Sequence, residues 1–328
     1  MVPLWKFDEK QRITTPELEE ILKEEVLKYW NSPKKLFPGP QPVSIEYKDI
    51  EVLRKKPYVA CAKLDGERFF LYSTQVPIDL QKPNQNLLNI SFLINRNFQF
   101  FITTLNWPEE MYKNKILLDG ELIEKTFIVH DSIIINGNII NKEPWDTRWH
   151  TANKFLSQYG GKHHSLTIKL KKFYTIPQLN ILFRDMKEQT TPSDGIIFYP
   201  IKEPIGYRHQ PTLLKWKPPG KHTMDFKIII EGHKVKLMAW ASGKDIEYKT
   251  LPITHFSNIE DLSSGDIIEF TTINKGRQLQ FKPIKKRTDK PVGNSLFTIK
   301  KTLLNIKQNI QQKDLEHIFT LSSLTPSS

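Results

Sequence analysis

Between residues 58 and 217 the chain is a succession of short apolar, β-branched segments, which limits the folds open to it more than any other feature. The segments include PYVACAKL, FFLYST, SFLINRNFQFF, KILLDGELI, TFIVHDSIIING and DGIIFYP. Each has the length of a strand, and many intervals between them are too short for the helical crossovers that parallel strands need. The pattern therefore predicts a mixed α+β fold built mostly on antiparallel sheet.

Amphipathic helices are expected on both sides of this strand-rich region. TTPELEEILKEEVLKYW, residues 14–30, has a proline near its start and apolar side chains along one face. SLFTIKKTLLNIKQNIQQKDLEHIF, residues 295–319, places Leu296, Ile299, Leu303, Ile306 and Ile310 at helical spacing. We expect helices to flank the sheets and the last one to pack back on the large domain.

The segment KPPGKHT, residues 217–223, predicts a hinge because it holds two prolines and a glycine between two strand-rich regions. MDFKIIIEG, KVKLMAW, DIIEFTTI and QLQFKPI follow it, and these short strands are typical of a small β-barrel such as an OB-fold. The sequence therefore predicts a large domain over 1–218, to which helix 302–328 returns, and a C-terminal OB-fold domain over 219–301.

The 328 residues carry a formal net charge of +12, which favours phosphate-bearing partners because positive surface attracts polyanions. Cys61 is the only cysteine, which excludes an intramolecular disulfide and a cysteine-based zinc site and fits a reducing compartment. The sequence shows neither a signal-peptide pattern nor an apolar run long enough to span a membrane. We expect a soluble, monomeric, intracellular protein.

Charged residues interrupt several of the strand segments. In LLKWKP, Lys215 and Lys217 face the same side of their strand, and burying both is costly unless an anion lies over them. Asp65, Asp119 and Asp194 each precede a glycine, and one such pair alone is typical of a hairpin turn. The specific signal is the chain order in which KLDGER, LLDGELIE, SDGIIFYP, LLKWKP and KRTDK follow one another.

In this order the segments resemble the motifs of the superfamily that joins mRNA capping guanylyltransferases and ATP-dependent polynucleotide ligases. KLDGER resembles its KxDGxR nucleotidyl-transfer motif, and the later segments resemble its other motifs across almost the whole chain. TMDF, residues 223–226, and RTDKPVGN, residues 287–294, resemble the capping branch in particular. The compact length resembles the small monofunctional capping enzymes of large DNA viruses, which implies action in the cytoplasm, a viral factory or the virion.

The resemblance implies transfer of GMP from GTP, through a lysyl-N-GMP intermediate, to the 5′-diphosphate end of RNA, which forms the GpppN cap. Lys63 is then the nucleophile. Because a protonated lysine cannot attack, Lys215 and Lys217 are expected to activate it and to stabilise the transition state. Asp194 is expected close to Lys63 and the metal, and Asp194 and Glu121 are candidate ligands for Mg²⁺ or Mn²⁺.

The resemblance also implies how GTP is bound. Arg68 and Glu121 match positions that hold the ribose hydroxyls, and Arg96, in INRNF, matches an arginine near the sugar and phosphates.

The RTDK segment belongs to the presumed small domain. Arg287, Asp289 and Lys290 match a segment that closes over the nucleotide and orients its β- and γ-phosphates, with the hinge near residue 219 allowing this closure. Asp225 lies in the same moving domain and is a further candidate for the GTP site.

Two residues bear on the choice of base. Lys171, in KLKKFY, matches a lysine that donates to the guanine oxygen in capping enzymes, and Lys172 is the alternative register. Capping enzymes commonly place a stacking aromatic ring where TFIVHD has His130. His130 either stacks on the base with a smaller ring, with Phe127 contributing, or packs under the sheet.

Two other functions remain open at this point. An ATP-dependent ligase would share Lys63, Glu121 and the RxDK motif, but usually has a longer chain with a DNA-clamping domain. An inactive, RNA-binding OB-fold protein would account for the basic charge equally well. Because no segment resembles an RNA triphosphatase or a cap methyltransferase, we expect separate proteins to perform those steps.

Overall fold

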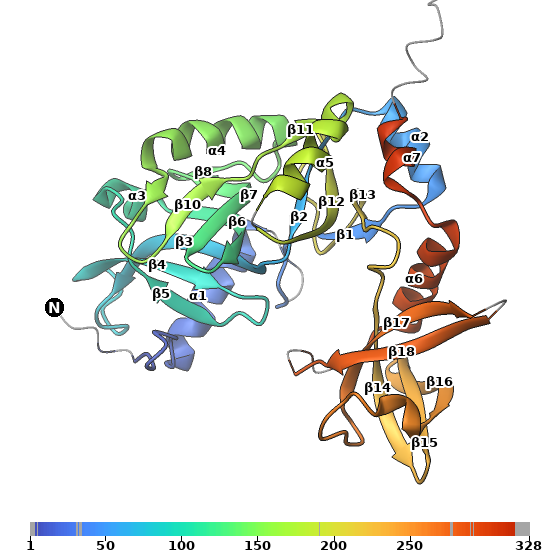
Figure 1. The fold of residues 1–328 in the computed structure, drawn as a ribbon. Helices are drawn as coiled ribbons and strands as arrows, with labels where there is room; N and C mark the ends of the chain where they lie inside the picture. The colour runs from blue at the N-terminus through green and yellow to red at the C-terminus, as the bar shows by residue number, and fades with distance from the viewer. Residues whose placement is uncertain are drawn as a thin grey trace, which may run out of the picture. The chain divides into compact units, whose positions relative to one another are not determined.

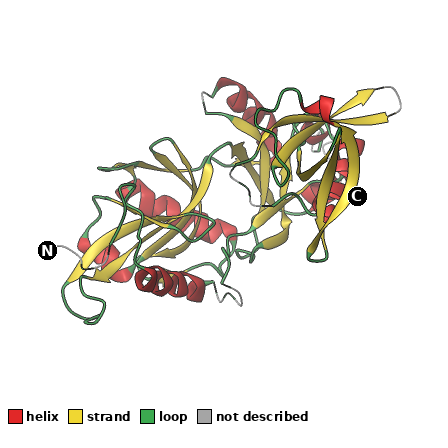
Figure 2. Ribbon diagram, turned by 90° about the horizontal axis from the view of Figure 1, so that it is seen from below, coloured by secondary structure: helices red, strands yellow, loops and turns green. Residues whose placement is uncertain are grey.

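The computed structural model of the protein describes residues 4, 6–30, 32, 35–189, 191–275, 278–288, 290 and 292–318. Contacts between residues divide the chain into two compact units. The first consists of Met1–Val43 and Lys55–Lys215, and the second of Ser44–Arg54 and Trp216–Ser328. Strands make up most of the regular structure of both units, with helices beside them (Figure 2), which confirms the predicted mixed α+β fold.

An eight-stranded sheet forms the larger part of the first unit (Figure 1). Its strands run in the order β5-β4-β3-β6-β7-β10-β9, with β8 beside β7. Their bounds are β3 (Glu67–Pro77), β4 (Leu87–Ile94), β5 (Phe100–Thr103), β6 (Ile116–Ile123), β7 (Thr126–Ile135), β8 (Asn138–Ile139), β9 (Gly161–Lys162) and β10 (Thr167–Leu170). All pairs are antiparallel except β7 with β10, whose connection contains a helix, as parallel pairing requires.

Helices cover both faces of this sheet. Phe70 and Tyr72 of β3 pack with Leu22 of α1 (Pro16–Tyr29), the helix predicted for residues 14–30. Leu71, which points to the opposite face, packs with Phe155 and its neighbours, where α3 (Glu109–Asn114) and α4 (Trp145–Tyr159) lie. Figure 1 shows α1 and α4 on opposite sides of the strands. The strands are therefore apolar on both faces, and a charged side chain within them needs a specific partner.

A second, five-stranded sheet completes the first unit, in the order β1-β13-β12-β2-β11. Its strands are β1 (Gln41–Ser44), β2 (Tyr58–Leu64), β11 (Tyr174–Thr175), β12 (Ser193–Pro200) and β13 (His209–Trp216), with η1 (Ile176–Gln178) and α5 (Leu179–Glu188) following β11. Asp65 and Gly66 form the turn between β2 and β3, so this turn leads from one sheet to the other. KLDGER therefore spans the junction of the two sheets.

The other two aspartate-glycine pairs are not hairpin turns. Asp119 and Gly120 lie inside β6, and Asp194 and Gly195 lie near the start of β12. At each place the register with a neighbouring strand shifts by one residue, which is a β-bulge. A Cβ atom on Gly120 would lie 2.6 Å from the Phe127 ring, so the strand passes too close to its neighbour for any other residue.

The second unit is built on a five-stranded antiparallel sheet in the order β16-β15-β14-β17-β18. Its elements are β14 (Met224–Glu231), β15 (Lys234–Ala241), β16 (Lys244–Pro252), η2 (Ile253–Phe256), β17 (Ile267–Lys275), β18 (Gln278–Lys286), α6 (Leu296–Gln308), α7 (Gln312–Glu316) and, from earlier in the chain, α2 (Tyr47–Lys55). Phe226, Leu237 and Phe270 lie in its core together with Ile299 of α6. None of the helices in the described part of the chain has the length and apolar character needed to cross a bilayer.

The last helix differs from the expectation for residues 295–319. It ends at Asn309, whose φ of +52° is left-handed, and the short helix α7 follows. Its apolar face packs on the sheet of the second unit, and Asn305 donates a hydrogen bond to the backbone oxygen of Ile45. The two units therefore differ from the domain boundaries predicted from the sequence, because residues 44–54 group with the C-terminal part.

Candidate active site at the junction of two sheets

Lys63 and Asp194 form an ion pair on neighbouring strands of the five-stranded sheet. Lys63 Nζ donates to Asp194 Oδ1 at 2.6 Å, and both side chains are about one quarter exposed, at 23% and 26%. The register passes from Ser193 opposite Leu64 to Gly195 opposite Lys63, so Asp194 is the extra residue of the bulge. The bulge therefore places the carboxylate against the lysine amine.

A cavity of about 130 Å³ opens beside Lys63, between the ends of the two sheets. Its lining carries the chemistry-bearing side chains of Lys63, Asp65, Arg68, Arg96, Asp119, Glu121, His130 and Asp131, and the apolar or aromatic side chains of Pro40, Pro42, Leu64, Ile197, Tyr199 and Leu213. The structure thus brings five of the predicted site residues, Lys63, Arg68, Arg96, Glu121 and His130, together around one cavity.

Arg68, at the start of β3, is held by Asp119 of β6. Arg68 Nε lies 2.9 Å from Asp119 Oδ1, Nη2 donates to Oδ2, and Nη1 donates to the backbone oxygen of Pro40. Both side chains are nearly buried, with 9% and 1% of their surface exposed. Burial alone lowers the pKa of Arg68, but the charge and hydrogen bonds of Asp119 outweigh this and raise it. The guanidinium is therefore a fixed positive group in the cavity wall.

Glu121 forms the next ion pair along β6. It lies directly opposite Arg68 in the strand register, and its Oε2 accepts a hydrogen bond from Lys171 Nζ at 3.0 Å. Lys171 follows β10, and only 4% of its side chain is exposed, whereas Lys172 is 65% exposed and pairs with Asp185. Lys171 and Lys172 are the two candidates for the base contact in the sequence. Only Lys171 is buried beside a residue that lines the cavity.

His130 is the extra residue of the bulge between β6 and β7, opposite Asp119 and Gly120. Its Nε2 lies 3.4 Å from Asp119 Oδ1, and its buried Nδ1 has no hydrogen-bond partner among the described residues. Burial, followed by the charges of Arg68 and Lys171, lowers the pKa of His130 to about 3. The imidazole is therefore neutral at physiological pH and lines the cavity as an uncharged ring.

Several lining residues were not expected from the sequence. Asp131 is held by Arg148 of α4 through two hydrogen bonds of 2.8 Å, and Ile197, Tyr199 and Leu213 form an apolar floor. A charged residue inside the apolar segment TFIVHDSIII is a signal that could have identified Asp131. The floor residues carry no such signal, because any buried strand has apolar residues of this kind.

The two lysines of LLKWKP lie at the end of β13. Lys215 is within the strand, Lys217 follows it directly, and the buried Trp216 lies between them. Both lysines are half-buried, as expected for side chains that alternate with a buried one. Lys215 belongs to the first unit with Lys63, where β12 lies between their two strands, and Lys217 belongs to the second unit.

The remaining predicted residues lie in the second unit. Arg287 and Lys290 both contact the carboxylate of Asp225, which is buried on β14. Asp289 lies outside the described residues. The motifs TMDF and RTDK, far apart in the sequence, therefore meet in one cluster.

Among the described residues, no three His, Cys, Asp or Glu side chains gather at the spacing of a metal cage. Asp194 supplies carboxylate oxygens beside Lys63, and Glu121 is engaged by Lys171. Mg²⁺ is commonly held by one or two carboxylates together with substrate phosphates and water. The residues present therefore fit an ion that arrives with a triphosphate.

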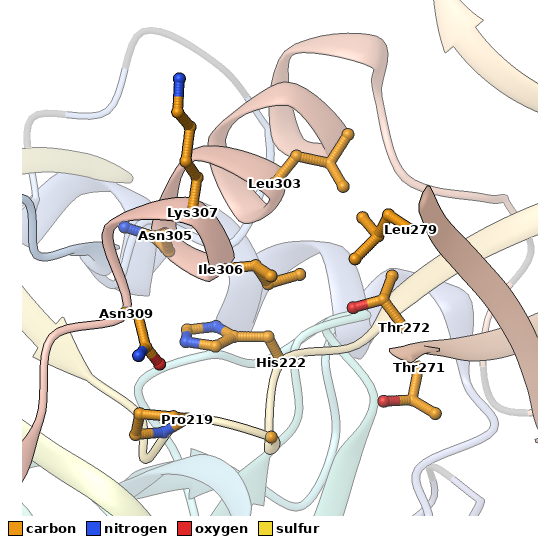
Figure 3. Close-up of a pocket in the computed structure, with 11 residues that line it drawn as sticks. Pro219, His222, Thr271, Thr272, Leu279, Leu303, Asn305, Ile306, Lys307 and Asn309 are labelled. Atoms are coloured by element: carbon orange, nitrogen blue, oxygen red, sulfur yellow. The ribbon is translucent and has the colours of Figure 1, made fainter. Parts of the chain in front are cut away.

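A cavity of about 770 Å³ in the second unit has none of these predicted residues among its lining residues (Figure 3). It is bounded by the segment 219–222, by Thr271 and Thr272 of β17, and by α6, from which Leu303 and Ile306 point toward it. Its lining is mixed polar and apolar and contains one charged side chain, Lys307. Neither its size nor its position therefore marks it as the site predicted from the motifs.

Comparison with known proteins bears on the chemistry of the first cavity. The profile of the family described as mRNA capping enzyme, catalytic domain, matches residues 10–219. The mRNA-capping enzyme subunit alpha of Saccharomyces cerevisiae is 26% identical over 384 residues, covering 90% of this chain and 82% of that protein. The Schizosaccharomyces pombe subunit is 24% identical over 344 residues, covering 90% and 83%. The mRNA-capping enzyme of Caenorhabditis elegans is 25% identical over 288 residues, covering 81% and 46%.

A solved structure described as mycobacterial DNA ligase D complexed with ATP and MES aligns with 77% of this chain and 96% of that chain. Its TM-score is 0.42 and its sequence identity is 10%. A likeness this low supports no conclusion about the substrate.

Proposed function

The chain belongs to the mRNA capping enzyme family and is an mRNA guanylyltransferase, and we propose how its residues perform the two steps of that reaction. GTP and RNA are its substrates. The observation that carries the proposal is the ion pair of Lys63 with Asp194 at the edge of a cavity lined by Arg68 and Glu121. A lysine, a carboxylate next to it and fixed positive charge are what nucleotidyl transfer through a lysine requires.

In the first step Lys63 Nζ attacks the α-phosphorus of GTP. Its ammonium gives up one proton before the attack, and Asp194 Oδ1, at 2.6 Å, is the acceptor that we assign. The nitrogen forms a bond to the α-phosphorus, the bond from that phosphorus to the bridging oxygen breaks, and pyrophosphate leaves. A second proton passes from the nitrogen to solvent as the phosphoramidate forms.

Positive groups balance the charge that develops on the phosphates. We assign this role to Lys215 and Lys217 near the α-phosphate and to Arg287 and Lys290 around the leaving pyrophosphate. Asp289 belongs to the same segment, which orients the β- and γ-phosphates. Members of this family use a divalent metal ion, and Mg²⁺ or Mn²⁺ held by Asp194 and the substrate phosphates would neutralise further negative charge.

In the second step the RNA 5′-diphosphate takes the GMP. An oxygen of its terminal phosphate attacks the same α-phosphorus, the phosphorus–nitrogen bond breaks, and Lys63 takes back a proton. The GpppN cap results, and the amine is again available for GTP. Triphosphatase and methyltransferase steps would come from separate proteins that act before and after this one.

The guanosine is proposed to occupy the cavity above the apolar floor. Arg68 and Glu121 would hold the ribose, Arg96 the sugar and phosphates, and the neutral ring of His130 would contact the base. Lys171, buried beside Glu121, would donate to the guanine oxygen, a group that adenine lacks.

We further propose that the second unit is an OB-fold domain. Three consecutive strands form a meander, β14 pairs with β17, and a short helix precedes β17, which is an arrangement compatible with that fold. A monomeric enzyme that acts on mRNA inside the cell, and a viral source, also remain proposals.

Incubation with α-labelled GTP or ATP and Mg²⁺, followed by denaturing electrophoresis, tests the function. We expect label on the protein from GTP, none in a Lys63→Ala variant, and transfer of the label to 5′-diphosphate RNA. Label from ATP alone would indicate the ligase chemistry instead, and label retained by Lys63→Ala would refute the assigned nucleophile. Salt-dependent RNA binding without any labelling would indicate an inactive RNA-binding protein.

A further inference from the structure

Asp225, in the TMDF segment, holds both cations of the RTDK segment. Its carboxylate is 5% exposed and lies on β14, where Oδ1 is 3.4 Å from Arg287 Nη1 and Oδ2 accepts a hydrogen bond from Lys290 Nζ. Glu269, on the neighbouring strand β17, lies 3.6 Å from the same Arg287 atom. A carboxylate this buried is stable only with such partners.

The backbone fixes the same arrangement. Asn294 donates its backbone N–H to the backbone oxygen of Asp225 at 2.6 Å, and its side-chain Oδ1 accepts a hydrogen bond from the backbone N–H of Asp225 at 2.9 Å. A Cβ atom on Gly293 would lie 2.8 Å from the backbone nitrogen of Lys227, so only glycine allows this approach. Gly293 and Asn294 are therefore attached to β14.

The two cations remain accessible from the outside of this cluster. The Arg287 side chain is 20% exposed and that of Lys290 is 35% exposed, whereas the carboxylate beneath them is almost fully covered. A ligand phosphate can therefore approach the cations, but Asp225 itself is shielded by them. Long flexible side chains lose conformational freedom when held, and here that loss occurs before any ligand arrives.

We propose that Asp225 is a positioning residue that holds Arg287 and Lys290 in the orientation that receives the leaving pyrophosphate, and that it does not itself contact GTP. This inference rests on the function proposed above. It differs from the assignment of Asp225 to the GTP site that the sequence resemblance implies.

The two steps of the reaction separate this role from a structural one. Pyrophosphate forms when the lysine nitrogen displaces it from the α-phosphorus, and no pyrophosphate takes part when RNA removes the GMP. Loss of Asp225 should therefore slow the first step and spare the second. A residue needed only for folding would affect both steps alike.

The test compares Asp225→Asn with Asp245→Asn. Asp245 is a matched control because it is an ion-paired carboxylate of the same sheet, but its partner is Lys227. Formation of lysyl-GMP is timed after mixing with labelled GTP, and transfer is timed separately by adding 5′-diphosphate RNA to enzyme already labelled.

In Asp225→Asn we expect the first step to slow by on the order of tenfold to a hundredfold, as for a misplaced catalytic group. The second step should change by less than about twofold, and Asp245→Asn should match the wild type in both. Equal losses in both steps, or no loss in the first, would overturn the proposal.

Two further measurements cover other results. If Asp225→Asn does not fold, Asn294→Ala should show the same selective loss at smaller size, and an unchanged ratio of the two rates would count against the proposal. If the wild type forms no lysyl-GMP, the proposed function fails. The rate of acylation of the Lys290 amine then tests whether Asp225 holds this side chain in place. Faster acylation in Asp225→Asn than in the wild type supports the ion pair as a positioning contact, and equal rates refute it.

Discussion

Lys63 Nζ and Asp194 Oδ1 lie 2.6 Å apart because the strand that carries the aspartate has one residue more than its partner at that point. His130 is placed in the same way, by a bulge in β7 opposite Asp119 and Gly120. Both bulges lie at the cavity, where the two sheets meet. Bulges re-aim single side chains without disturbing the rest of a strand, and this site uses two of them.

Asp194→Asn removes the proposed proton acceptor and keeps the shape of the side chain. We expect formation of lysyl-GMP to slow by on the order of a hundredfold or more, as for loss of a general base. Quenched-flow labelling with α-labelled GTP measures this rate directly.

Glu67→Gln is the control for Asp194→Asn, since Glu67 is an exposed carboxylate at the start of β3. Its rate should equal that of the wild type. If the Asp194→Asn variant formed lysyl-GMP as fast as this control, a group other than Asp194 would have to accept the proton from Lys63.

Arg68→Lys tests the forked contact with Asp119. A lysine keeps the charge but cannot replace both hydrogen bonds to the carboxylate and the third to Pro40, so buried acceptors lose their partners. We expect the free energy of unfolding to fall by about 1 to 3 kcal/mol, measured by urea denaturation.

Arg184→Lys is the matched control for Arg68→Lys, because Arg184 is 65% exposed and lies 3.8 Å from its carboxylate partner. Its effect should stay within about 0.5 kcal/mol. Equal effects of the two variants would show that burial of the Arg68 pair adds nothing to stability.

His130 should make the protein less stable in acid. Burial lowers its pKa from 6.5 to about 3, so below pH 6.5 the unfolded chain binds a proton that the folded chain does not. Its contribution to the free energy of unfolding falls as the pH drops from 6.5 toward 3 and is constant above 6.5. Between about pH 7 and about pH 5, the wild type should lose about 2 kcal/mol more than His130→Gln.

His150→Gln is the control for the substitution itself, because it makes the same change at an exposed histidine. Urea denaturation at both pH values gives the free energy of unfolding of the wild type and of each variant. The loss between the two pH values is then compared among the three proteins. A His130→Gln variant that followed the wild type would mean that the imidazole takes up its proton in the folded protein.

Lys171→Met should weaken the preference for GTP over ATP. We expect the ratio of labelling rates from the two nucleotides to fall by about tenfold to a hundredfold, the usual effect of one base-specific hydrogen bond. The ratio is the useful quantity, because leaving Glu121 unpaired lowers both rates together.

Lys172→Met is the comparison for Lys171→Met, because Lys172 is the neighbouring, exposed lysine. It should leave the ratio unchanged. If the ratio of labelling rates from GTP and ATP fell only in the Lys172→Met variant, Lys172 and not Lys171 would be the residue that contacts the base.

Much of this arrangement follows from the sequence. Apolar segments of strand length predict the sheets, and the helical spacing of residues 14–30 predicts α1. Arg68, Glu121 and Lys171 come together because they lie on strands, or just after one, of the same sheet. Lys63 lies on the other sheet and is brought beside Arg68 by the turn from β2 to β3. Local patterns of this kind are set by the alternation of side chains along a strand.

The rest depends on pairing that no local pattern records. Asp194 meets Lys63 only through a shift in register, and Asp119 holds Arg68 from the diagonal position of the neighbouring strand. The pairs Asp119–Gly120 and Asp194–Gly195 look like turns in the sequence, because glycine is common in turns. Glycine is equally necessary where two strands approach closely, which is its role at Gly120 inside β6. The grouping of residues 44–54 with the second unit likewise arises from contacts distant in the chain, such as Asn305 with Ile45.

The turn from β2 to β3 connects the two sheets through only Asp65 and Gly66. Two residues span at most about 7 Å, so the length of the chain limits how far apart Lys63 and Arg68 can lie. β3 is held in register by β4 and β6, so one inserted residue would lengthen the turn and shift Lys63 relative to Arg68 while leaving both sheets able to form. Insertions in this turn should therefore yield a folded but inactive protein, so the number of residues in KLDGER is restricted by catalysis rather than by folding.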